Sequence, residues 1–401
     1  MKVAVPRETA SGERRVALVP GDVAKLAGVG IEVLVEKEAG STAHLGADEF
    51  MEAGAKIVSE ASALYAEADV VVKIQPPSEE EVSHLREGSA LVSFLLAQEE
   101  PVIVRSLRER KVTSFSMNLV PRITRAQSID ALSSMSTLAG YKAVLVGAAS
   151  MGKIMPMLVT AAGTIAPAKV LVLGAGVAGL QAIATARRLG ARVFGFDVRP
   201  AVKEQVESLG AKFIESELSE SAEGKGGYAR ELSEDAQARN LATIAAHIGD
   251  MDLVITTALI PGKPAPVLIT EKMLESMKPG AVIVDLAAER GGNCVLSHAD
   301  QEVVHDGVTI LGPTNLPSTI PLHASQMYSR NIATFLRLLV KDGNMHLDFD
   351  DEVIAGMCVT HAGEIRHAET RAALGEAAGS EAAGSEAAGS EAAGTKEKGE
   401  S

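Results

Sequence analysis

The chain has 401 residues and a formal net charge of -14, and 46% of its residues are hydrophobic. This length and composition allow two buried cores, so we expect two domains. The acidic balance argues against a nucleic-acid partner, whose phosphates need a basic protein face, and against docking on anionic lipid.

Strands and helices alternate in the N-terminal third of the chain. Short apolar runs bounded by Gly, Pro or charges predict strands at 3–6, 31–36, 70–74 and 90–94. Helix-like stretches, such as 22–26 and 62–67, lie between them. This alternation indicates βαβ units and a mostly parallel sheet. The segment 123–146, whose only glycine is Gly140, predicts a long helix that joins two domains.

A second alternating series begins near residue 169. Its apolar runs predict strands at 169–173, 192–196, 252–256, 281–285 and 308–311. Helical spacing predicts helices at 177–189, 202–209, 232–248 and 323–339. The last helix would return the chain to the first domain. We therefore predict an α/β fold of two Rossmann-like domains with parallel sheets, one formed by residues 1–134 and 320–375 and the other by residues 135–319.

Residues 376–401 repeat Glu-Ala-Ala-Gly with a period of five. A glycine in every repeat weakens a helix by ~1 kcal/mol each time, and nothing in the repeat can form a core. We expect a flexible acidic tail, with a partial helix as the alternative.

Cysteine content and hydropathy bear on the cellular compartment. Cys294 and Cys358 are too few for a disulfide framework or a zinc site, so we expect buried structural thiols and no metal. The N-terminus lacks the apolar region of a signal peptide, and no window approaches the ~18 apolar residues of a membrane span. These features predict a cytoplasmic protein.

A glycine-rich motif follows the strand predicted at 169–173. Residues 174–179 read Gly-Ala-Gly-Val-Ala-Gly and match the pattern G-x-G-x-x-G. Gly174 would permit a tight turn, Gly176 would let the backbone approach a pyrophosphate, and Gly179 would let the helix pack closely on the sheet. The helix N-terminus would add N–H groups and a partial positive charge. We predict a dinucleotide site whose residues are Gly174, Ala175, Gly176, Val177, Ala178 and Gly179.

The next predicted strand ends at Asp197, followed by Val198 and Arg199. The Asp197 carboxylate would accept hydrogen bonds from the adenosine ribose and would repel the additional phosphate of NADP, which favours NAD(H). Arg199 favours NADP(H) instead, because arginine can bind that additional phosphate. The alternative to a dinucleotide site is an ordinary strand–turn–helix without a ligand.

Longer stretches are more specific than the glycine motif. They read PRITRAQSID at 121–130, LAGYKA at 138–143 and TTALIPGKPAP at 256–266, with VPRE at 5–8 and ERRVAL at 13–18. They resemble the soluble NAD(H)-binding component (alpha subunit, domain I) of proton-translocating NAD(P) transhydrogenase, a family related to alanine dehydrogenase. The resemblance covers about residues 1–375.

The resemblance implies a homodimer that binds NAD(H) in the cleft between the two Rossmann-like domains. It also implies two partners, an NADP(H)-binding component and a membrane-spanning component that translocates protons. Hydride would pass directly from NADH to NADP⁺ on the partner. The chain would lie at the cytoplasmic face of the inner membrane through these partners, without inserting into the membrane.

Direct hydride transfer moves no proton between substrate and protein, so orientation replaces acid–base catalysis. The resemblance places Arg122, Gln127, Asp130 and Ser133 around the nicotinamide and its ribose, with Gln127 reaching toward the partner's nucleotide. The spacing of three between Gln127, Asp130 and Ser133 predicts one helix face. The alternative is a polar cap on a long helix, with Arg122 and Asp130 as a surface ion pair.

Further candidate contacts follow the predicted strand ends. Thr257, Ala258 and Leu259 follow one strand, and Asp285 and Leu286 end or follow the next, so their backbone groups are candidates for contact with NAD. Plain strand exits are the alternative. The glycine-rich segment 224–229 contains Tyr228, which the resemblance places in a mobile loop that closes over the nucleotide. An inert surface loop is the alternative.

Two other functions compete with transhydrogenation. An amino-acid dehydrogenase resembling alanine dehydrogenase needs a carboxylate anchor and a proton-transferring residue, and Lys73 could be part of such a site. The histidine of that family corresponds here to Leu95, which cannot carry a proton. The other histidines, such as His84 and His298, are scattered. A non-catalytic NAD-binding regulatory module is the second alternative.

Overall fold

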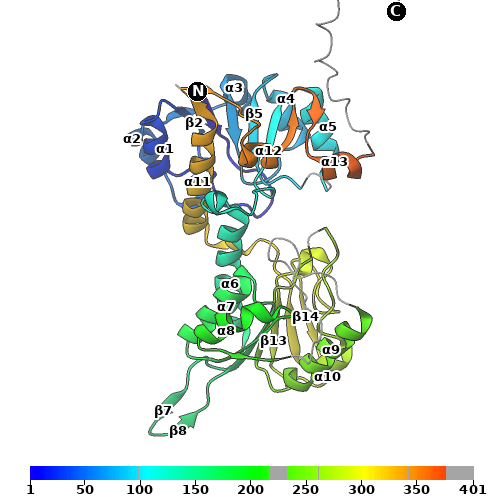
Figure 1. Cartoon of the computed structure of the whole chain (residues 1–401). Helices are drawn as coiled ribbons and strands as arrows, with labels where there is room; N and C mark the ends of the chain where they lie inside the picture. Colours follow the sequence, from blue (N-terminus) through cyan, green and yellow to red (C-terminus); the bar gives the residue numbers. More distant parts are fainter. Residues whose placement is uncertain (97–98, 216–232, 261, 342, 376–401) are drawn as a thin grey trace, which may run out of the picture.

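The computed structural model describes residues 1–375 except 97–98, 216–232, 261 and 342. These residues form two lobes, each built around one sheet (Figure 1). The predicted segments 224–229 and 376–401 lie outside the described residues. Within the described ranges of the chain, no helix is long and apolar enough to cross a membrane.

The first sheet has the order β19-β18-β6-β5-β4-β1-β2-β3. Its strands are β1 (Lys2–Val5), β2 (Glu32–Glu36), β3 (Lys56–Val58), β4 (Val70–Val72), β5 (Ala90–Ser93), β6 (Thr113–Ser116), β18 (Cys358–His361) and β19 (Glu364–Ile365). β1 to β6 pair in parallel, whereas β18 is antiparallel to both β6 and β19.

Helices cover both faces of the first sheet. They are α1 (Pro20–Ala27), α2 (Ala47–Glu52), α3 (Ala61–Glu67), α4 (Glu79–His84), α5 (Pro101–Glu109), α11 (Pro321–Leu338), α12 (Glu352–Met357) and α13 (Ala368–Ala373). Tyr328 and Phe335 of α11 belong to the core on one face, and Leu64 of α3 and Leu107 of α5 belong to the core on the other. Local signals set several helix starts, such as Pro20 in the first turn of α1 and the Ser78–Glu81 capping box of α4.

The second sheet has the order β11-β10-β9-β12-β13-β15-β14. Its strands are β9 (Lys169–Leu173), β10 (Arg192–Phe196), β11 (Lys212–Phe213), β12 (Leu253–Thr256), β13 (Val282–Asp285), β14 (Glu302–His305) and β15 (Val308–Leu311). The helices around it are α6 (Ala131–Ser150), α7 (Val177–Arg188), α8 (Lys203–Ser208), α9 (Glu234–Ile248) and α10 (Glu271–Glu275). The predicted α/β class with parallel-dominated sheets is confirmed, and the antiparallel edge strand β14 is an addition to the predicted strands.

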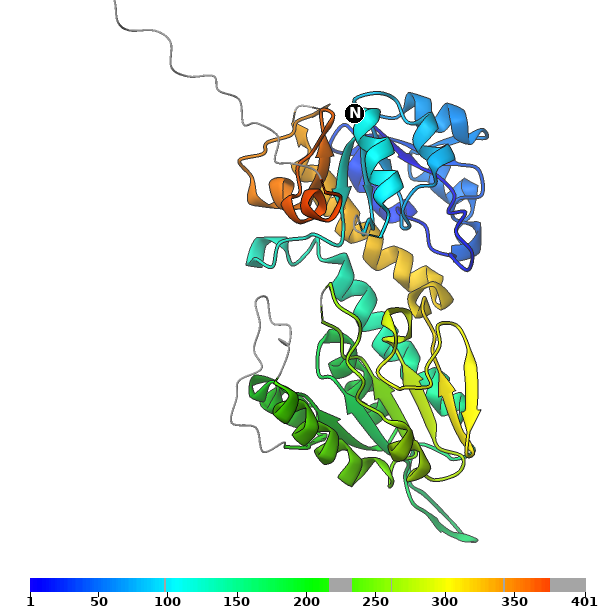
Figure 2. The same ribbon diagram turned by 90° about the vertical axis from the view of Figure 1, so that its right-hand side faces the viewer.

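Helix α6 connects the two lobes (Figures 1 and 2). Its first half contributes Ala131 and Met135 to a core of the first sheet, and its second half contributes Ala143 and Val144 to a core of the second. Gly140 lies where α6 crosses α7, because a Cβ there would be 2.0 Å from the Ala178 carbonyl oxygen. The predicted joining helix is therefore present, but it begins at Ala131 rather than at residue 123.

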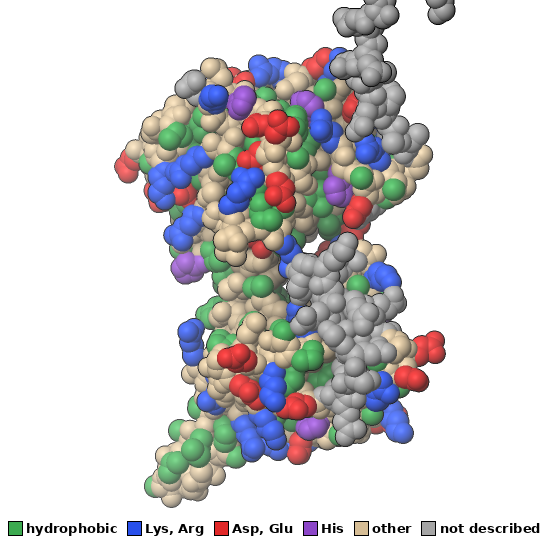
Figure 3. Space-filling model, viewed as in Figure 1, with side chains coloured by type: hydrophobic (Ala, Val, Ile, Leu, Met, Phe, Trp, Pro, Cys, Tyr) green, Lys and Arg blue, Asp and Glu red, His purple; other side chains and the backbone are tan. Residues whose placement is uncertain are grey.

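Two small antiparallel pairs are also absent from the sequence predictions. The first is β7 (Leu158–Thr160) with β8 (Gly163–Ile165), and the second is β16 (Val340–Lys341) with β17 (Asn344–Met345). The β7–β8 hairpin projects from the second lobe, and its apolar side chains are visible on the surface (Figure 3). All of its strand residues are exposed, so no apolar–polar alternation marks it in the sequence.

Candidate functional site

The glycine-rich turn joins β9 to α7 as predicted. Gly174 has a φ of +96°, and a Cβ at that position would lie 2.6 Å from the Thr257 hydroxyl. A Cβ on Gly179 would lie 1.8 Å from the Gly174 carbonyl oxygen. Both positions therefore require glycine for the packing of the turn itself.

Gly176 differs from these two glycines because its Cβ position has no heavy atom within 4 Å. The residue is the N-cap of α7, where the first N–H groups of a helix have no intrahelical partner. Open space at a helix N-terminus fits the pyrophosphate of a dinucleotide. The residues of the turn thus fit the predicted cofactor.

Asp197 follows β10 and faces the glycine-rich turn. Its Oδ2 accepts a hydrogen bond of 2.7 Å from the Ala175 amide, and its Oδ1 accepts one of 2.8 Å from the Arg199 amide. The Arg199 guanidinium also donates to both oxygens, at 2.9 and 2.7 Å. The carboxylate therefore stands where a ribose is expected, but Arg199 engages it already. Val198 is half-buried between them in the chain.

The ends of β12 and β13 lie beside the same turn. The Thr257 hydroxyl donates to the Gly174 carbonyl oxygen at 3.1 Å. Leu259 is exposed, and the Leu286 amide donates to Thr256 within the sheet. The Asp285 side chain is fully buried and accepts four hydrogen bonds, from the Thr256 hydroxyl and the amides of Ala287, Asn293 and Cys294, at 2.8, 2.9, 2.7 and 3.0 Å. All four donors belong to this chain, so the carboxylate holds the loop together.

The loop before α6 carries the residues that were predicted around the nicotinamide. Asp130 is the N-cap of α6, and its carboxylate accepts from the Ser133 amide at 2.9 Å and the Ser133 hydroxyl at 2.5 Å. Gln127 ends a short 3-10 turn ahead of the helix and is exposed, as is Arg122. The prediction that Gln127, Asp130 and Ser133 share one helix face is therefore wrong, because the capping aspartate starts the helix after Gln127.

This loop is fixed by distant segments of the chain. The Arg125 guanidinium binds both oxygens of Asp351, the N-cap of α12, at 2.9 and 2.7 Å. The side-chain amide of Asn331, in α11, donates a hydrogen bond to the Ser128 carbonyl oxygen at 2.8 Å. From Asp130 to Gly140, the rise of α6 separates this loop from the crossing with α7 by about 15 Å. Helix α6 thus connects the loop to the glycine-rich turn.

The carboxyl ends of the two sheets also approach each other. Arg290, in the loop after β13, forms an ion pair with Glu99, in the loop after β5. In open α/β sheets, ligands bind at the carboxyl ends of the strands. Tyr228, the remaining predicted contact, lies outside the described residues.

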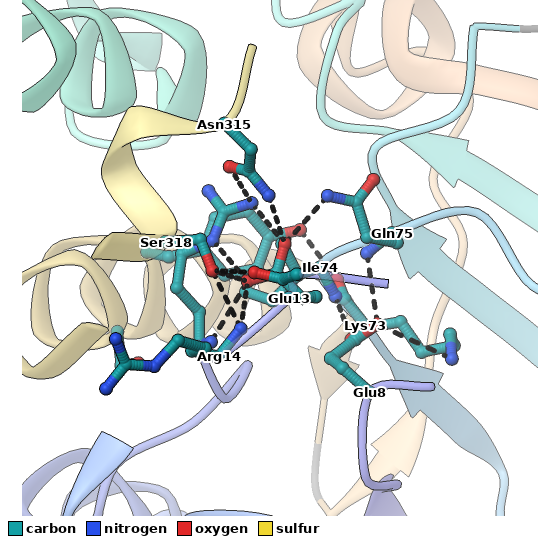
Figure 4. Close-up of polar contacts among 12 residues, drawn as sticks. Glu8, Glu13, Arg14, Lys73, Ile74, Gln75, Asn315 and Ser318 are labelled. Atoms are coloured by element: carbon teal, nitrogen blue, oxygen red, sulfur yellow. Dashed lines mark hydrogen bonds and ion pairs between the residues drawn. The ribbon is translucent and has the colours of Figure 1, made fainter. Parts of the chain in front are cut away.

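Sequence reasoning missed a buried cluster at the second connection between the lobes (Figure 4). The Glu13 carboxylate accepts hydrogen bonds from the Arg15 guanidinium at 2.7 and 2.6 Å. It also accepts from the side-chain amides of Gln75, at 2.7 Å, and Asn315, at 3.1 Å. Burial opposes ionisation of Glu13, but the bonds and charge of Arg15 outweigh it and lower the pKa to about 2. The sequence contains no signal for this cluster, since Glu13 and Asn315 are far apart along the chain.

Lys73 belongs to the same region and is buried. Its ammonium lies 2.6 Å from a Glu81 oxygen and 3.6 Å from a Glu8 oxygen. Burial raises the pKa of Glu8 above its ordinary value, against the opposing effect of Lys73. Leu95 is also buried. Both Arg15 and Lys73 therefore have carboxylate partners from the same chain.

The two cysteines are buried, as predicted. Burial raises the pKa of the Cys294 thiol to about 11 and that of the Cys358 thiol to about 12. Both therefore remain protonated at neutral pH and act as apolar side chains.

Comparisons with known proteins cover almost all of the described chain. The family model for the alanine dehydrogenase/PNT N-terminal domain matches residues 4–139, and the model for its C-terminal domain matches residues 143–368. An NAD(P) transhydrogenase alpha-subunit chain of Rhodospirillum rubrum is 50% identical over 376 residues, which cover 92% of this chain and 98% of that protein. Alanine dehydrogenase 2 of Staphylococcus aureus is 31% identical over 86% of this chain and 88% of that protein.

A solved structure of a transhydrogenase from Sinorhizobium meliloti has 42% sequence identity and a TM-score of 0.81, and the match covers 92% of this chain and all of that one. The two matched family models divide the chain within α6, close to the crossing with α7. The chain therefore belongs to the alanine dehydrogenase/PNT family.

Proposed function

We propose that this chain is the NAD(H)-binding component of a proton-translocating NAD(P) transhydrogenase. It would pass hydride directly from NADH to NADP⁺ bound on a partner component, and a membrane-spanning component would couple this reaction to proton translocation. The observation that carries the proposal is 50% identity over 98% of a protein named as an NAD(P) transhydrogenase alpha-subunit chain. The geometry of the glycine-rich turn independently supports the binding of a dinucleotide.

The glycine-rich turn and Asp197 would bind different parts of the dinucleotide. The N-terminus of α7 and the space at Gly176 would receive the pyrophosphate, and Asp197 would receive the adenosine ribose. The backbone groups of Ala258 and Leu259, which follow β12, would also contact NAD(H). Bound NADH supplies the hydride itself.

The polar residues near α6 would orient the nicotinamide rather than transfer protons. Asp130 and Ser133 are already hydrogen-bonded to each other, and Gln127 and Arg122 are exposed. Hydride transfer between two nicotinamides needs close approach and alignment, without a general acid or base. An exposed Gln127 is suited to a nucleotide that arrives on another protein.

The contacts of Lys73 and Arg15 favour this function over an amino-acid dehydrogenase. Such an enzyme needs a cation that binds the substrate carboxylate and a residue that takes up a proton. Here Lys73 is engaged by Glu81 and Glu8, Arg15 is engaged by Glu13, and Leu95 cannot titrate.

We also propose that the chain forms a homodimer in the cytoplasm and reaches the membrane through its partners.

Absorbance measurements test the proposal. The purified chain is mixed with NADH and an oxidised nicotinamide analogue, with and without an NADP(H)-binding transhydrogenase component. Exchange that requires the partner is the expected result. Alanine-dependent reduction of NAD⁺ would indicate an amino-acid dehydrogenase, and NADH binding without either reaction would indicate a regulatory module.

A further inference from the structure

The side chain of Asn293, in the loop after β13, forms hydrogen bonds with the backbone of the loop that follows β12. Its side-chain oxygen accepts a hydrogen bond of 3.0 Å from the Ala258 amide. Its side-chain nitrogen donates to the Ala258 carbonyl oxygen at 2.9 Å and to the Pro266 carbonyl oxygen at 2.8 Å. One fully buried amide therefore holds both backbone groups of Ala258 and ties them to a residue further along the same loop.

The backbone of Asn293 is itself anchored. Its amide donates to the buried Asp285 carboxylate at 2.7 Å, and its carbonyl oxygen accepts from the amides of Leu268 and Ile269 at 2.8 and 2.9 Å. Asp285 also receives the Thr256 hydroxyl at 2.8 Å. The Asn293 side chain thus belongs to a hydrogen-bonded network that begins at the ends of β12 and β13. This network leaves its side-chain amide little freedom to rotate.

Ala258 lies directly beside the glycine-rich turn. A Cβ on Gly174 would be 3.3 Å from the Ala258 nitrogen, and the preceding residue, Thr257, donates to the Gly174 carbonyl oxygen at 3.1 Å. A shift of the Ala258 peptide would therefore move the wall of the nucleotide site. A shift of this kind alters binding without removing any group that touches the ligand.

We propose that Asn293 is a positioning residue for NAD(H), which sets the Ala258 backbone against the glycine-rich turn. The inference rests on the proposed function, because it assumes that the dinucleotide binds at this turn. Asparagine suits the position since a side-chain amide accepts and donates simultaneously. A carboxylate at this site could accept from the Ala258 amide but would face two carbonyl oxygens without a proton to share.

The test uses this difference in protonation. In Asn293→Asp the new carboxyl group would be buried between two carbonyl oxygens, which raises its pKa above the ordinary value of about 4. At low pH the protonated group can donate to one carbonyl oxygen, and at high pH it cannot. We expect NADH affinity close to wild type at about pH 6 and about tenfold weaker at about pH 8.5, which corresponds to about 1.4 kcal/mol.

Two further variants of the full chain make the result specific. Asn293→Ser keeps a small neutral polar group, and we expect weaker NADH binding that does not depend on pH beyond the wild-type profile. Asn240→Asp, in α9, places a carboxyl group at another buried asparagine. It should lower the melting temperature without changing the pH profile of NADH binding. NADH fluorescence gives the dissociation constants, and circular dichroism gives the melting temperatures.

The inference is overturned if folded Asn293→Asp and Asn293→Ser both bind NADH as wild type does across this pH range. Equal pH profiles for Asn293→Asp and Asn240→Asp would also overturn it. Failure of hydride exchange with the partner, while NADH binding responds as expected, would contradict the proposed function and leave the role of Asn293 supported. A wild-type chain that does not bind NADH would contradict both.

Discussion

The Arg199 guanidinium spans the Asp197 carboxylate, with donor–acceptor distances of 2.9 Å to Oδ1 and 2.7 Å to Oδ2. Together with the amides of Ala175 and Arg199, it brings the number of hydrogen bonds accepted by Asp197 to four. A carboxylate has about four favourable acceptor positions. A ribose hydroxyl must therefore displace a donor, and the guanidinium is the only one of these donors that is not part of the local backbone.

Asp197→Asn should weaken NAD(H) binding and reduce the preference of the site for NAD(H) over NADP(H). The substitution removes a charged acceptor for the ribose hydroxyls, so we expect roughly a tenfold loss of NADH affinity, near 1.4 kcal/mol. It also removes the negative charge that would repel an additional phosphate. Calorimetric titration with NADH and NADPH measures both effects. Asp250→Asn is the control, because Asp250 forms an ion pair with Lys169 at the opposite end of β9. Unchanged affinity for both nucleotides would reject the ribose role.

Arg199→Ala should increase discrimination against NADPH. Removal of the guanidinium leaves the Asp197 carboxylate unneutralised and takes away the cation that could receive the additional phosphate. NADH binding should be retained, because a ribose hydroxyl no longer competes with Arg199. The ratio of the two dissociation constants is the measurement, and a ratio that moves toward NADPH would contradict this expectation.

Gly176→Ala and Gly179→Ala should separate binding from folding. A methyl group at Gly176 meets open space, so the variant should fold normally and bind NADH more weakly because the methyl group occupies the place of the pyrophosphate. A methyl group at Gly179 would lie 1.8 Å from a carbonyl oxygen, so that variant should lose about 1–3 kcal/mol of stability. Thermal melts and NADH titrations distinguish the two. Equal losses of stability would show that Gly176 is a packing residue.

Gln127→Asn should slow hydride exchange with the partner far more than it weakens NADH binding. The shorter side chain would withdraw an orienting group from an exposed position that precedes α6. Such a separation of rate from affinity identifies a contact made during transfer. Gln301→Asn, at an exposed position next to β14, is the control. If the rate and the affinity fell together, Gln127 would be a binding residue only.

Glu13→Gln should reduce the acid sensitivity of folding. The pKa of Glu13 is lowered from 4.5 to about 2 by Arg15, so the folded state gains stability from its ionised form above pH 4.5 and loses that stability as the pH falls toward 2. The variant should be less stable at neutral pH and show a smaller decrease over this interval. Melting temperatures measured from acid to neutral pH test this, with Glu32→Gln as an exposed control. Parallel curves for wild type and Glu13→Gln would contradict it.

Local patterns explain what could be predicted from the sequence. The strand at 169–173, the turn at 174–179 and the helix from Val177 agree with the structure, because each is specified by neighbouring residues. The predicted start of α6 is wrong although its signal is also local. Asp130 caps the helix through the Ser133 amide, whereas the predicted helix includes that aspartate in its interior.

Contacts between distant segments explain what could not be predicted. The hydrogen-bond partners of Glu13 include Gln75 and Asn315, and the Asn293 side chain is hydrogen-bonded to the Ala258 backbone. No spacing rule connects such positions. The antiparallel strand β18 likewise joins β6 from a distant segment of the chain. The candidate contacts named from the sequence remain predictions, whereas the groups that hold them in place are found only in the structure.

Partner-dependent hydride exchange is the decisive test of the proposed function. The chain and an NADP(H)-binding transhydrogenase component are mixed with NADH and an oxidised NADP analogue, and absorbance follows reduction of the analogue. We expect rapid reduction when both proteins are present and none when either is omitted. Tight binding of NADH without any reduction in the complete mixture would contradict direct hydride transfer by this chain.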